Sequence, residues 1–248
     1  MRLDAALTAR GLCSSRNRAQ TSIAEGHVTV NGMICMKAAH QVNDDDVLLV
    51  TQSLPYVGRG GYKLAYALAE FEISVGGLHC LDIGASTGGF TDCLLQNGAA
   101  SVLAVDVGHD QIAPQLREDP RVRVMEGTDI RLLPPDTEGL PANFISCDVS
   151  FISLTQIFPV LPPLLAEGGC AVVLVKPQFE VGPGALNKHG VVRDPKVHQR
   201  VLREIRNAAA GAGLIPRSAS ESPVKGGSGN TEFLLLLEKP VFSGAESG

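Results

Sequence analysis

Residues 81–96 read LDIGASTGGFTDCLLQ, and this stretch decides the fold that we expect. Its apolar beginning continues a run from residue 78 and predicts a strand, whereas the apolar spacing after Phe90 is typical of a helix. Between them lies a turn of small residues with the pattern D-x-G-x-x-x-G-G. Small residues at this place let a ligand approach the backbone at the carboxyl end of a strand. The stretch therefore predicts a strand, a ligand-binding turn and a helix of an α/β domain.

The sequence on both sides repeats this alternation. We expect strands near residues 78–83, 101–106, 121–125, 143–148, 170–175, 214–220 and 232–238, and helices near 63–71, 88–97, 110–117, 153–166 and 195–211. Such alternation is typical of a Rossmann-like, doubly wound α/β sheet with parallel strands. The last two strands have no helix between them, so we expect them to pair in antiparallel fashion at one edge. Pro159, Pro162 and Pro163 predict a kink or break in the helix over 153–166.

The beginning of the chain has a pattern of its own. Apolar spacing predicts helices over residues 3–10 and from residue 15 onward, and strands at 28–30 and 47–50. Asn31-Gly32 is a strong signal for a hairpin turn, and residues 51–62 are rich in Gly, Ser and Pro, as linkers are. We therefore predict a small α+β domain over residues 1–55, a linker over 56–62 and a larger domain over 63–248.

The composition is that of a globular protein, with 44% hydrophobic and 19% charged residues among 248. The net charge is −5, but the charges are unevenly distributed. Residues 1–63 carry seven basic and five acidic residues, and residues 185–225 carry eight basic and three acidic ones. Residues 64–184, between them, carry five basic and fifteen acidic residues. Two basic segments thus flank an acidic one, and local charge decides whether phosphates are attracted. The sequence shows no secretory signal, no apolar run of about 18 residues and no C-x-x-C pair, so we expect a cytoplasmic protein with reduced thiols.

Three acidic residues at successive strand ends predict a nucleoside cofactor. Asp82 before the glycine turn would repel the pyrophosphate of NAD and favour the cationic groups of S-adenosylmethionine. Asp106, about 20 residues past the turn, can accept hydrogen bonds from ribose hydroxyls, and Asp129 lies where an adenine amine could be held. Each acid alone would more often be a solvated loop residue or a helix cap. The residues that we expect to contact the cofactor are Asp82, Gly84, Ser86, Gly88, Gly89, Phe90, Asp106, Val107 and Asp129.

Four further charged residues stand beside strand ends or apolar segments, namely Lys63, Asp148, Lys176 and Glu232. In a doubly wound sheet, Asp148 and Lys176 would share the crevice that holds the cofactor. Taken singly, Lys176 could instead extend from a buried strand to solvent, and Asp148 could cap the following helix. The six histidines show no metal-ligand spacing, so we expect no metal.

Longer runs of the sequence resemble the hemolysin-A-type (TlyA) rRNA methyltransferases, which join a small RNA-binding domain to an FtsJ-like methyltransferase domain. The resemblance covers nearly the whole chain. The matching motifs are RLD at residues 2–4, SR at 15–16, VNG at 30–32, RGGYKL at 59–64, LDIGASTGGFTDCLLQ at 81–96, AVDVG at 104–108, DVSFISL at 148–154, LVKPQFE at 174–180, GVVRDP at 190–195 and GNTEFLLLL at 229–237.

The resemblance implies that S-adenosylmethionine methylates the 2′-hydroxyl of a ribose in ribosomal RNA or ribosomal subunits, typically at a cytidine. It places the Lys-Asp-Lys-Glu tetrad of FtsJ-like enzymes at Lys63, Asp148, Lys176 and Glu232. Lys176 would orient the hydroxyl and, when neutral, accept its proton. Relatives often carry Asn where this chain has Asp129.

The first domain resembles the RNA-binding fold named after the fourth small-subunit ribosomal protein. We expect it to contact RNA through Arg2, Arg16, Arg18 and Lys37, with Arg59 as a further contact. Aromatic residues make up only 4% and Trp is absent, which favours recognition of RNA shape and backbone over base stacking. A small protein-docking domain is the alternative.

Other functions fit parts of these observations. They are a small-molecule methyltransferase with a docking module, a membrane-active hemolysin, and a binding protein that has lost catalysis. The sequence has no obvious basic amphipathic helix for membrane lysis, and the complete tetrad argues against lost catalysis. The sequence specifies neither the nucleotide, nor the ribosomal subunit, nor the oligomeric state.

Overall fold

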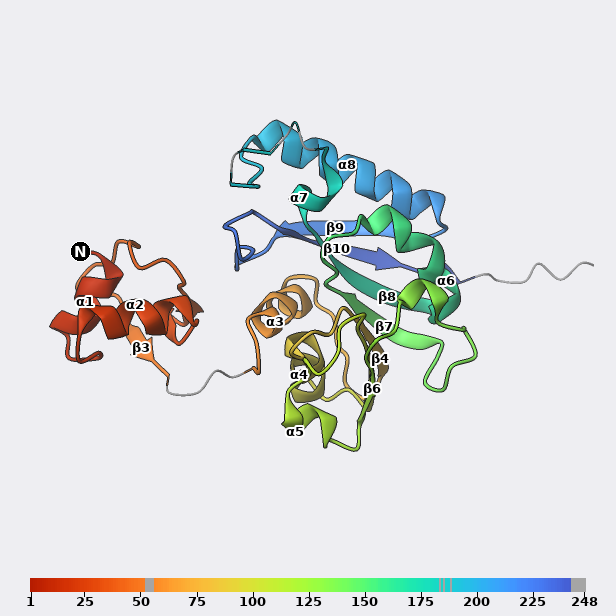
Figure 1. Ribbon diagram of the computed structural model, residues 1–248, viewed down its shortest axis with the longest axis horizontal. Coiled ribbons are helices and arrows are strands. Elements are labelled where there is room, and N and C mark those ends of the chain that lie inside the picture. Colours follow the sequence, from red (N-terminus) through yellow and green to blue (C-terminus); the bar gives the residue numbers. More distant parts are fainter. Residues whose placement is uncertain (52–55, 183, 185, 188, 242–248) are drawn as a thin grey trace, which may run out of the picture. The chain divides into compact units, whose positions relative to one another are not determined.

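A computed structural model describes residues 1–51, 56–182, 184, 186, 187 and 189–241 (Figure 1). The chain divides into two compact units, Met1–Arg59 and Gly60–Gly248. Helix α3 (Gly60–Glu70) begins within the stretch 56–62 that we predicted to be a linker. Residues 52–55, at the end of the predicted first domain, lie outside the described residues.

The first unit is a small α+β domain. Its elements are α1 (Leu3–Ala9), α2 (Arg16–Ala24), β1 (Val28–Val30), β2 (Met33–Ile34) and β3 (Leu48–Val50). The strands form an antiparallel sheet in the order β2-β1-β3. Asn31 and Gly32 have φ values of 53° and 81°, as the tight turn between β1 and β2 requires. Leu3, Leu7 and Ile23 from the two helices form the core of this unit with strand residues.

The second unit contains a seven-stranded mixed sheet with the order β6-β5-β4-β7-β8-β10-β9. The strands are β4 (His79–Ile83), β5 (Ser101–Val105), β6 (Val122–Met125), β7 (Ala142–Cys147), β8 (Leu165–Val175), β9 (Ile215–Glu221) and β10 (Phe233–Glu238). Strands β4 to β8 are parallel to one another, whereas β10 is antiparallel to both of its neighbours. This confirms the predicted Rossmann-like sheet and the antiparallel pairing of the last two strands.

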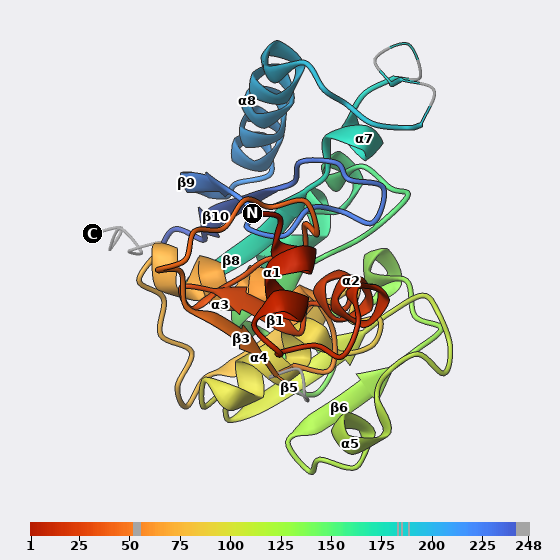
Figure 2. The ribbon, with the colours of Figure 1, turned by 90° about the vertical axis from the view of Figure 1, so that its left-hand side faces the viewer.

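Helices and turns complete the second unit. They are α3, α4 (Gly89–Gln96), α5 (Pro114–Arg117), η1 (Ile130–Leu132), η2 (Leu154–Gln156), η3 (Phe158–Val160), α6 (Leu161–Leu164), α7 (Pro177–Glu180) and α8 (Pro195–Gly211). Helices α3 and α4 lie on one face of the sheet, and α6 and α8 lie on the other (Figures 1 and 2). On the α8 face, Val201 and Ile205 pack into one apolar core with Ile145 and Val173.

The chain reverses direction along the sheet at β4, because β5 lies on one side of it and β7 on the other. In open α/β sheets, ligands bind outside the carboxyl ends of the strands at such a switch point. The fold therefore places the glycine-rich turn after β4 in the expected binding crevice.

The predicted break in the helix over 153–166 is confirmed, because this stretch forms η2, η3 and the four-residue α6. Pro159, Pro162 and Pro163 each lack the N–H that a continuous helix needs. Strand β8 begins at Leu165 rather than near residue 170, and its pairing with β7 is interrupted by a register shift. The backbone of Gly168 and Gly169 pairs with Lys239, which extends the strand ahead of residue 170.

In the part of the chain that the structure describes, no helix is both long and apolar enough to cross a membrane. All six cysteines are free thiols.

Candidate active site

The four side chains of the predicted tetrad meet at the carboxyl edge of the large sheet. Lys176 Nζ lies 2.6 Å from Asp148 Oδ1, and Lys63 Nζ lies 2.6 Å from Glu232 Oε2 and 4.0 Å from Asp148 Oδ2. Lys63, Lys176 and Glu232 are buried, with exposed fractions of 8%, 7% and 3%. Buried charges are tolerated when they are paired. Two positive and two negative side chains therefore balance one another inside this cluster.

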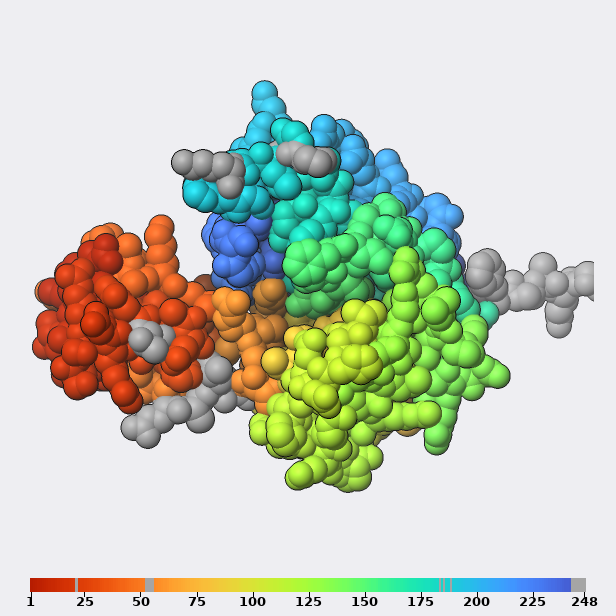
Figure 3. All heavy atoms as spheres, viewed as in Figure 1, coloured from red at the N-terminus to blue at the C-terminus, as the bar shows by residue number. Residues whose placement is uncertain are grey.

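The sheet topology explains how residues so far apart in sequence come together. Asp148 and Lys176 each follow the last residue of a parallel strand, β7 and β8. Strand β10 runs the opposite way and pairs Phe233 with Val175, so Glu232 lies beside Lys176 at the same edge. The first turns of α3 supply Lys63. Figure 3 shows segments of this unit in orange (α3), green (after β7) and blue (before β10) meeting on one face.

Lys176 has a second polar partner that the sequence analysis did not single out. Its Nζ donates a hydrogen bond to Ser150 Oγ at 2.7 Å and lies 5.9 Å from the centre of the Phe179 ring. Lys176 therefore does not extend to solvent. Asp148 is not a helix cap either, because the 3₁₀ turn η2 that follows it is capped by Ser153.

The glycine-rich turn packs directly against Asp148. Gly84 has a φ of +78°, and a Cβ atom at this position would lie 2.7 Å from the carbonyl oxygen of Asp148. Gly88 also has a positive φ, +93°, and its Cβ would meet the side chain of Leu116. L-residues rarely adopt such φ values. Glycine at both positions therefore lets the turn lie close to the end of β7 and to the segment around α5.

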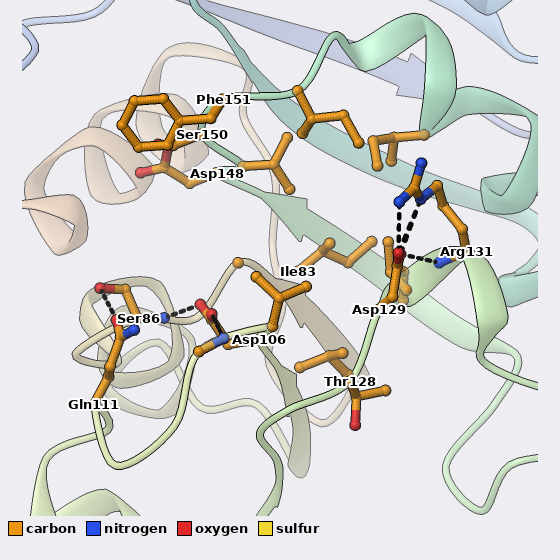
Figure 4. A pocket seen from close by; sticks show the side chains of 18 residues that line it. Ile83, Ser86, Asp106, Gln111, Thr128, Asp129, Arg131, Asp148, Ser150 and Phe151 are labelled. Carbon is orange, nitrogen blue, oxygen red and sulfur yellow. Dashed lines mark hydrogen bonds and ion pairs between the residues drawn. The ribbon is translucent and has the colours of Figure 1, made fainter.

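Asp106 connects the end of β5 to this turn. One carboxylate oxygen accepts a hydrogen bond from the backbone N–H of Ser86 at 2.8 Å, and the other accepts one from Gly108 at 2.7 Å. Each oxygen keeps a lone pair for a further donor. The Ser86 hydroxyl donates to Gln111 at 3.2 Å (Figure 4). Asp106 is therefore fixed with capacity left for the hydroxyls of a ribose.

Two adjoining hollows lie beside these residues. The larger, of about 450 Å³, is lined by Ile83, Gly84, Ser86, Val105, Asp106, Val107, Gly108, Gln111, Thr128, Asp129, Ile130, Arg131, Asp148, Val149, Ser150, Phe151, Ile152 and Ile157 (Figure 4). The smaller, of about 180 Å³, is lined by Gly60, Gly84, Ala85, Ser86, Thr87, Gly89, Phe90, Asp148, Ser150 and Lys176. Asp148 and Ser150 line both hollows, so a ligand in the larger one would reach toward the tetrad.

Asp82 lies beneath the turn and has no exposed surface. Its carboxylate accepts hydrogen bonds from Thr91 Oγ1 at 2.7 Å and Ser146 Oγ at 2.9 Å. Burial raises the pKa of Asp82 to about 6. The carboxylate thus joins the start of α4 to β7 under the turn, and any effect of its charge on a ligand would act through the turn.

We expect Asp82 to make stability depend on pH. An aspartate in the unfolded chain has a pKa of about 4. Between this pH and the folded pKa of about 6, the folded chain therefore holds a proton that the unfolded chain releases. The free energy of unfolding should therefore fall by about 3 kcal/mol as the pH rises through this interval, and it should then level off. Asp82→Asn should remove this decline, as urea unfolding at pH 4 and pH 7 would show. An identical pH dependence in parent and variant would contradict the assignment.

Asp129 is held by its own neighbour. It caps η1, and its carboxylate lies 2.6 Å from Nη2 of Arg131, whose hydrogen bonds lower the pKa of Asp129. A contact of Asp129 with an adenine amine stays a prediction. Val107 lines the same hollow and is 69% exposed, so it offers an apolar surface to a flat ring.

The small domain presents the predicted basic residues on its own surface. Asp4, which is buried, pairs with both Arg2 and Arg16 at 3.0 Å and accepts a hydrogen bond from Gln20 at 2.9 Å. The side chains of the two arginines are about half exposed. Hydrogen bonds from Arg2 hold the pKa of Asp4 well below its usual range. One buried carboxylate thus orients two arginines, a role that the sequence motif did not reveal.

The remaining predicted RNA contacts, Arg18, Lys37 and Arg59, are exposed. Arg18 lies in the first turn of α2, and its backbone N–H donates to Ser15 Oγ at 3.2 Å. Arg59 is the last residue of the first unit. Each of these side chains is therefore accessible to a partner.

Comparison with known proteins follows the same division of the chain. Residues 56–239 match the model of the FtsJ-like methyltransferases, and residues 1–48 match that of the S4 domain. The chain belongs to the FtsJ-like methyltransferase family. It is an S-adenosylmethionine-dependent methyltransferase with an S4 RNA-binding domain.

Several relatives match this methyltransferase over nearly all its length. The Bacillus subtilis protein YqxC is 49% identical over 242 residues, which is 96% of this chain and 86% of YqxC. A Mycobacterium tuberculosis protein named 16S/23S rRNA (cytidine-2′-O)-methyltransferase TlyA is 44% identical over 238 residues, 95% of this chain and 89% of the relative. A solved hemolysin-named structure from Streptococcus thermophilus has a TM-score of 0.75 and 44% identity, covering 97% of this chain and 88% of that chain. These relatives place the chain in the TlyA group.

The residues of the crevice fit S-adenosylmethionine. Glycine at position 84 lets the turn lie against the backbone of Asp148 at the edge of the crevice, and Asp106 keeps acceptor capacity for ribose hydroxyls. The larger hollow has an apolar side at Val107 and a volume in the range that holds small ligands. The smaller hollow extends toward Phe90 and Lys176. We infer that the nucleoside part would occupy the larger hollow and that the methionine part would extend into the smaller one.

Proposed function

We propose that this enzyme methylates the 2′-hydroxyl of a ribose in ribosomal RNA, that the nucleotide is a cytidine, and that the reaction takes place in the cytoplasm, where ribosomes are. The observation that carries the proposal is the buried cluster of Lys63, Asp148, Lys176 and Glu232 beside the cofactor crevice. Two relatives named as rRNA (cytidine-2′-O)-methyltransferases support the choice of substrate.

Each tetrad residue has a role in this proposal. When bound, the cofactor supplies a methyl group on a positively charged sulfur. Lys176 donates a hydrogen bond to the target oxygen, orients its lone pair and, when neutral, accepts the proton that leaves. Asp148 holds Lys176, and Glu232 holds Lys63, so that the amino groups are fixed and their charges are balanced. Much of the rate should then come from fixed in-line placement of the reacting atoms.

The S4 domain would supply affinity for RNA. The predicted contacts are Arg2, Arg16, Arg18, Lys37 and Arg59, and the first two of these are oriented by Asp4. Phosphate contacts release counterions, so binding should weaken steeply with salt.

Arg16→Gln should weaken RNA binding. It should also reduce the slope of the logarithm of affinity against the logarithm of salt concentration by about one. Arg123→Gln is the matched control, because Arg123 is similarly exposed and paired with one carboxylate, Glu138, but lies on β6 in the acidic segment 64–184. Filter binding to rRNA between 50 and 200 mM salt, roughly the range in which phosphate contacts are sensitive, would measure both. Equal effects of the two substitutions would show that net charge, not this surface, governs binding.

Phe151 offers a platform for the target base. It is 91% exposed, lines the larger hollow and lies three residues past Asp148. The low aromatic content of the sequence did not suggest such a residue. Base stacking on an aromatic ring is worth about 1–3 kcal/mol.

Phe151→Ala should therefore reduce kcat/KM for RNA by about 10- to 100-fold without changing cofactor affinity. Leu132→Ala is the control, since Leu132 is also exposed but does not line the larger hollow. Initial rates at varied RNA concentration and calorimetry with the cofactor provide the measurements. If both substitutions leave kcat/KM unchanged, Phe151 does not contact the substrate.

The proposed reaction is tested with tritiated S-adenosylmethionine and rRNA or ribosomal subunits from cells that lack the protein. Mass spectrometry then locates the label. Label on a cytidine 2′-oxygen would support the proposal in full, and label on another ribose would correct the nucleotide. Label on a base would refute 2′-O-methylation, and absence of label with cofactor bound would favour a small-molecule acceptor.

A further inference from the structure

Ser150 stands at the place where the cofactor crevice meets the tetrad. Its side chain lines both hollows, and its Oγ accepts a hydrogen bond from Lys176 at 2.7 Å. Lys176 also contacts Asp148 at 2.6 Å. Among the described residues, only the contact with Ser150 has the geometry of a hydrogen bond, because Asp148 Oδ1 accepts none. The Ser150 hydroxyl therefore fixes the direction of one N–H of Lys176, while Asp148 balances its charge.

The backbone that carries Ser150 is held from the other end of its loop. The rings of Phe151 and Phe179 lie 5.0 Å apart, and Glu180 accepts a hydrogen bond from Ser153 Oγ at 2.6 Å. Glu180 is partly buried, and burial raises its pKa. Residues 150–153 are thus joined to residues 176–180 by successive contacts, so the distance from Ser150 to Lys176 cannot relax freely.

The loop also contains an unfavourable backbone conformation. Phe151 has a φ of 63°, a region that bulky side chains rarely occupy and that persists only when surrounding contacts impose it. The turn at this residue directly follows Ser150. Strain of this kind clusters at functional sites, and here it accompanies the orientation of the serine hydroxyl toward the lysine.

We propose that Ser150 is a positioning residue for methyl transfer, whose hydroxyl fixes the amino group of Lys176 so that it faces the target oxygen. This inference rests on the proposed function, because it assumes that Lys176 acts on a ribose hydroxyl. Ser150 itself need not contact the substrate. Its hydroxyl matters as an acceptor for Lys176, so a residue of similar shape that lacks the hydroxyl should not replace it.

The test compares Ser150→Thr, which keeps the hydroxyl, with Ser150→Val. Valine has nearly the same shape as threonine but no hydroxyl. A hydrogen bond to a charged group contributes more free energy than one between neutral groups. Ser150→Val and Ser150→Ala should therefore lower kcat by about 10- to 100-fold. Ser150→Thr should stay within about threefold of the parent, and KM for the cofactor should change less than about twofold in all variants. Because Ser150 is exposed, these variants should fold. Near-parental kcat in Ser150→Val, or equal losses in the valine and threonine variants, would overturn the proposal.

A second measurement does not depend on activity. Crystal structures of the two variants should show the Lys176 amino group in its parental position with threonine and displaced with valine. An unchanged Lys176 in both would refute the positioning role even if kcat falls. The parental enzyme assayed in parallel on rRNA separates this result from failure of the proposed function, which would leave the parent itself without ribose methylation.

Discussion

Lys176→Ala should abolish detectable methyl transfer, with a loss in kcat of at least about 10³-fold, while cofactor affinity stays near the parental value. The physical reason is that Lys176 is the tetrad member that both lines the smaller hollow and pairs with Asp148. Its removal takes away the group that orients the hydroxyl and accepts its proton, and each of these effects is large. The cofactor turn, which is built by Gly84 and Asp106, is left intact.

The measurement combines initial rates with tritiated cofactor on rRNA and calorimetry of cofactor binding. Lys225→Ala is the matched control, because Lys225 precedes Glu232 by a short loop but is exposed and donates only to Thr231 among the described residues. It should change the rate by less than about twofold. Near-normal turnover in Lys176→Ala would show that the assigned role of Lys176 is wrong.

Gly84→Ala should strongly weaken cofactor binding and, with it, activity. A Cβ at this position would lie 2.7 Å from the backbone carbonyl of Asp148. Backbone at the end of a buried strand cannot move aside as a flexible side chain can, so either the turn or Asp148 must shift. A shift of the turn would also disturb the bond from Ser86 to Asp106. We expect cofactor affinity to fall by about 10- to 100-fold, since each lost hydrogen bond to a charged group costs about 1.5–3 kcal/mol.

Gly77→Ala separates the contact from the backbone strain. Gly77 has a φ of +74°, nearly that of Gly84 at +78°, but a Cβ there would meet nothing within 4 Å. Both substitutions should cost about 1–2 kcal/mol of stability through the positive φ, measurable by urea unfolding. The loss of cofactor affinity should appear in Gly84→Ala alone, by calorimetry. Equal cofactor affinity in the two variants would mean that the close approach of turn and strand is not needed for binding.

The two predictions differ in what they test. Lys176→Ala concerns chemistry at an intact cofactor site, whereas Gly84→Ala concerns the site itself. Both variants could instead bind the cofactor normally and lose only turnover. That result would mean that the turn is rigid and tolerates the extra carbon of alanine at position 84.

The sequence by itself determined the elements whose signals are local. Helix α8 spans Pro195–Gly211, as predicted, because Asp194 caps it, Pro195 begins it and the apolar spacing continues to its end. Strand β1 (Val28–Val30) and the turn at Asn31 follow from alternation and from turn chemistry in the same way. The tetrad residues could also be singled out from sequence, since each is a charged residue beside a strand end or an apolar segment.

Only the tertiary structure decided which side chains meet. The antiparallel insertion of β10 brings Glu232 to Lys63, and the packing of Asp4 joins Arg2 and Arg16. These contacts depend on strand order, on register and on burial between residues far apart in the chain, and no local spacing encodes them.

The same reason explains what the sequence analysis missed in the active site. In the sequence, Ser150 is an ordinary polar residue of a loop. Only the fold shows its role, because the end of β8 places Lys176 Nζ 2.7 Å from its Oγ. Asp82 was expected to contact the cofactor, and this contact stays a prediction; what the sequence did not show is that Thr91 and Ser146 donate to its buried carboxylate from α4 and β7. Sequence determined the chemical groups at the carboxyl edge of the sheet, and folding determined their partners, because distance and burial set the energy of a charged contact.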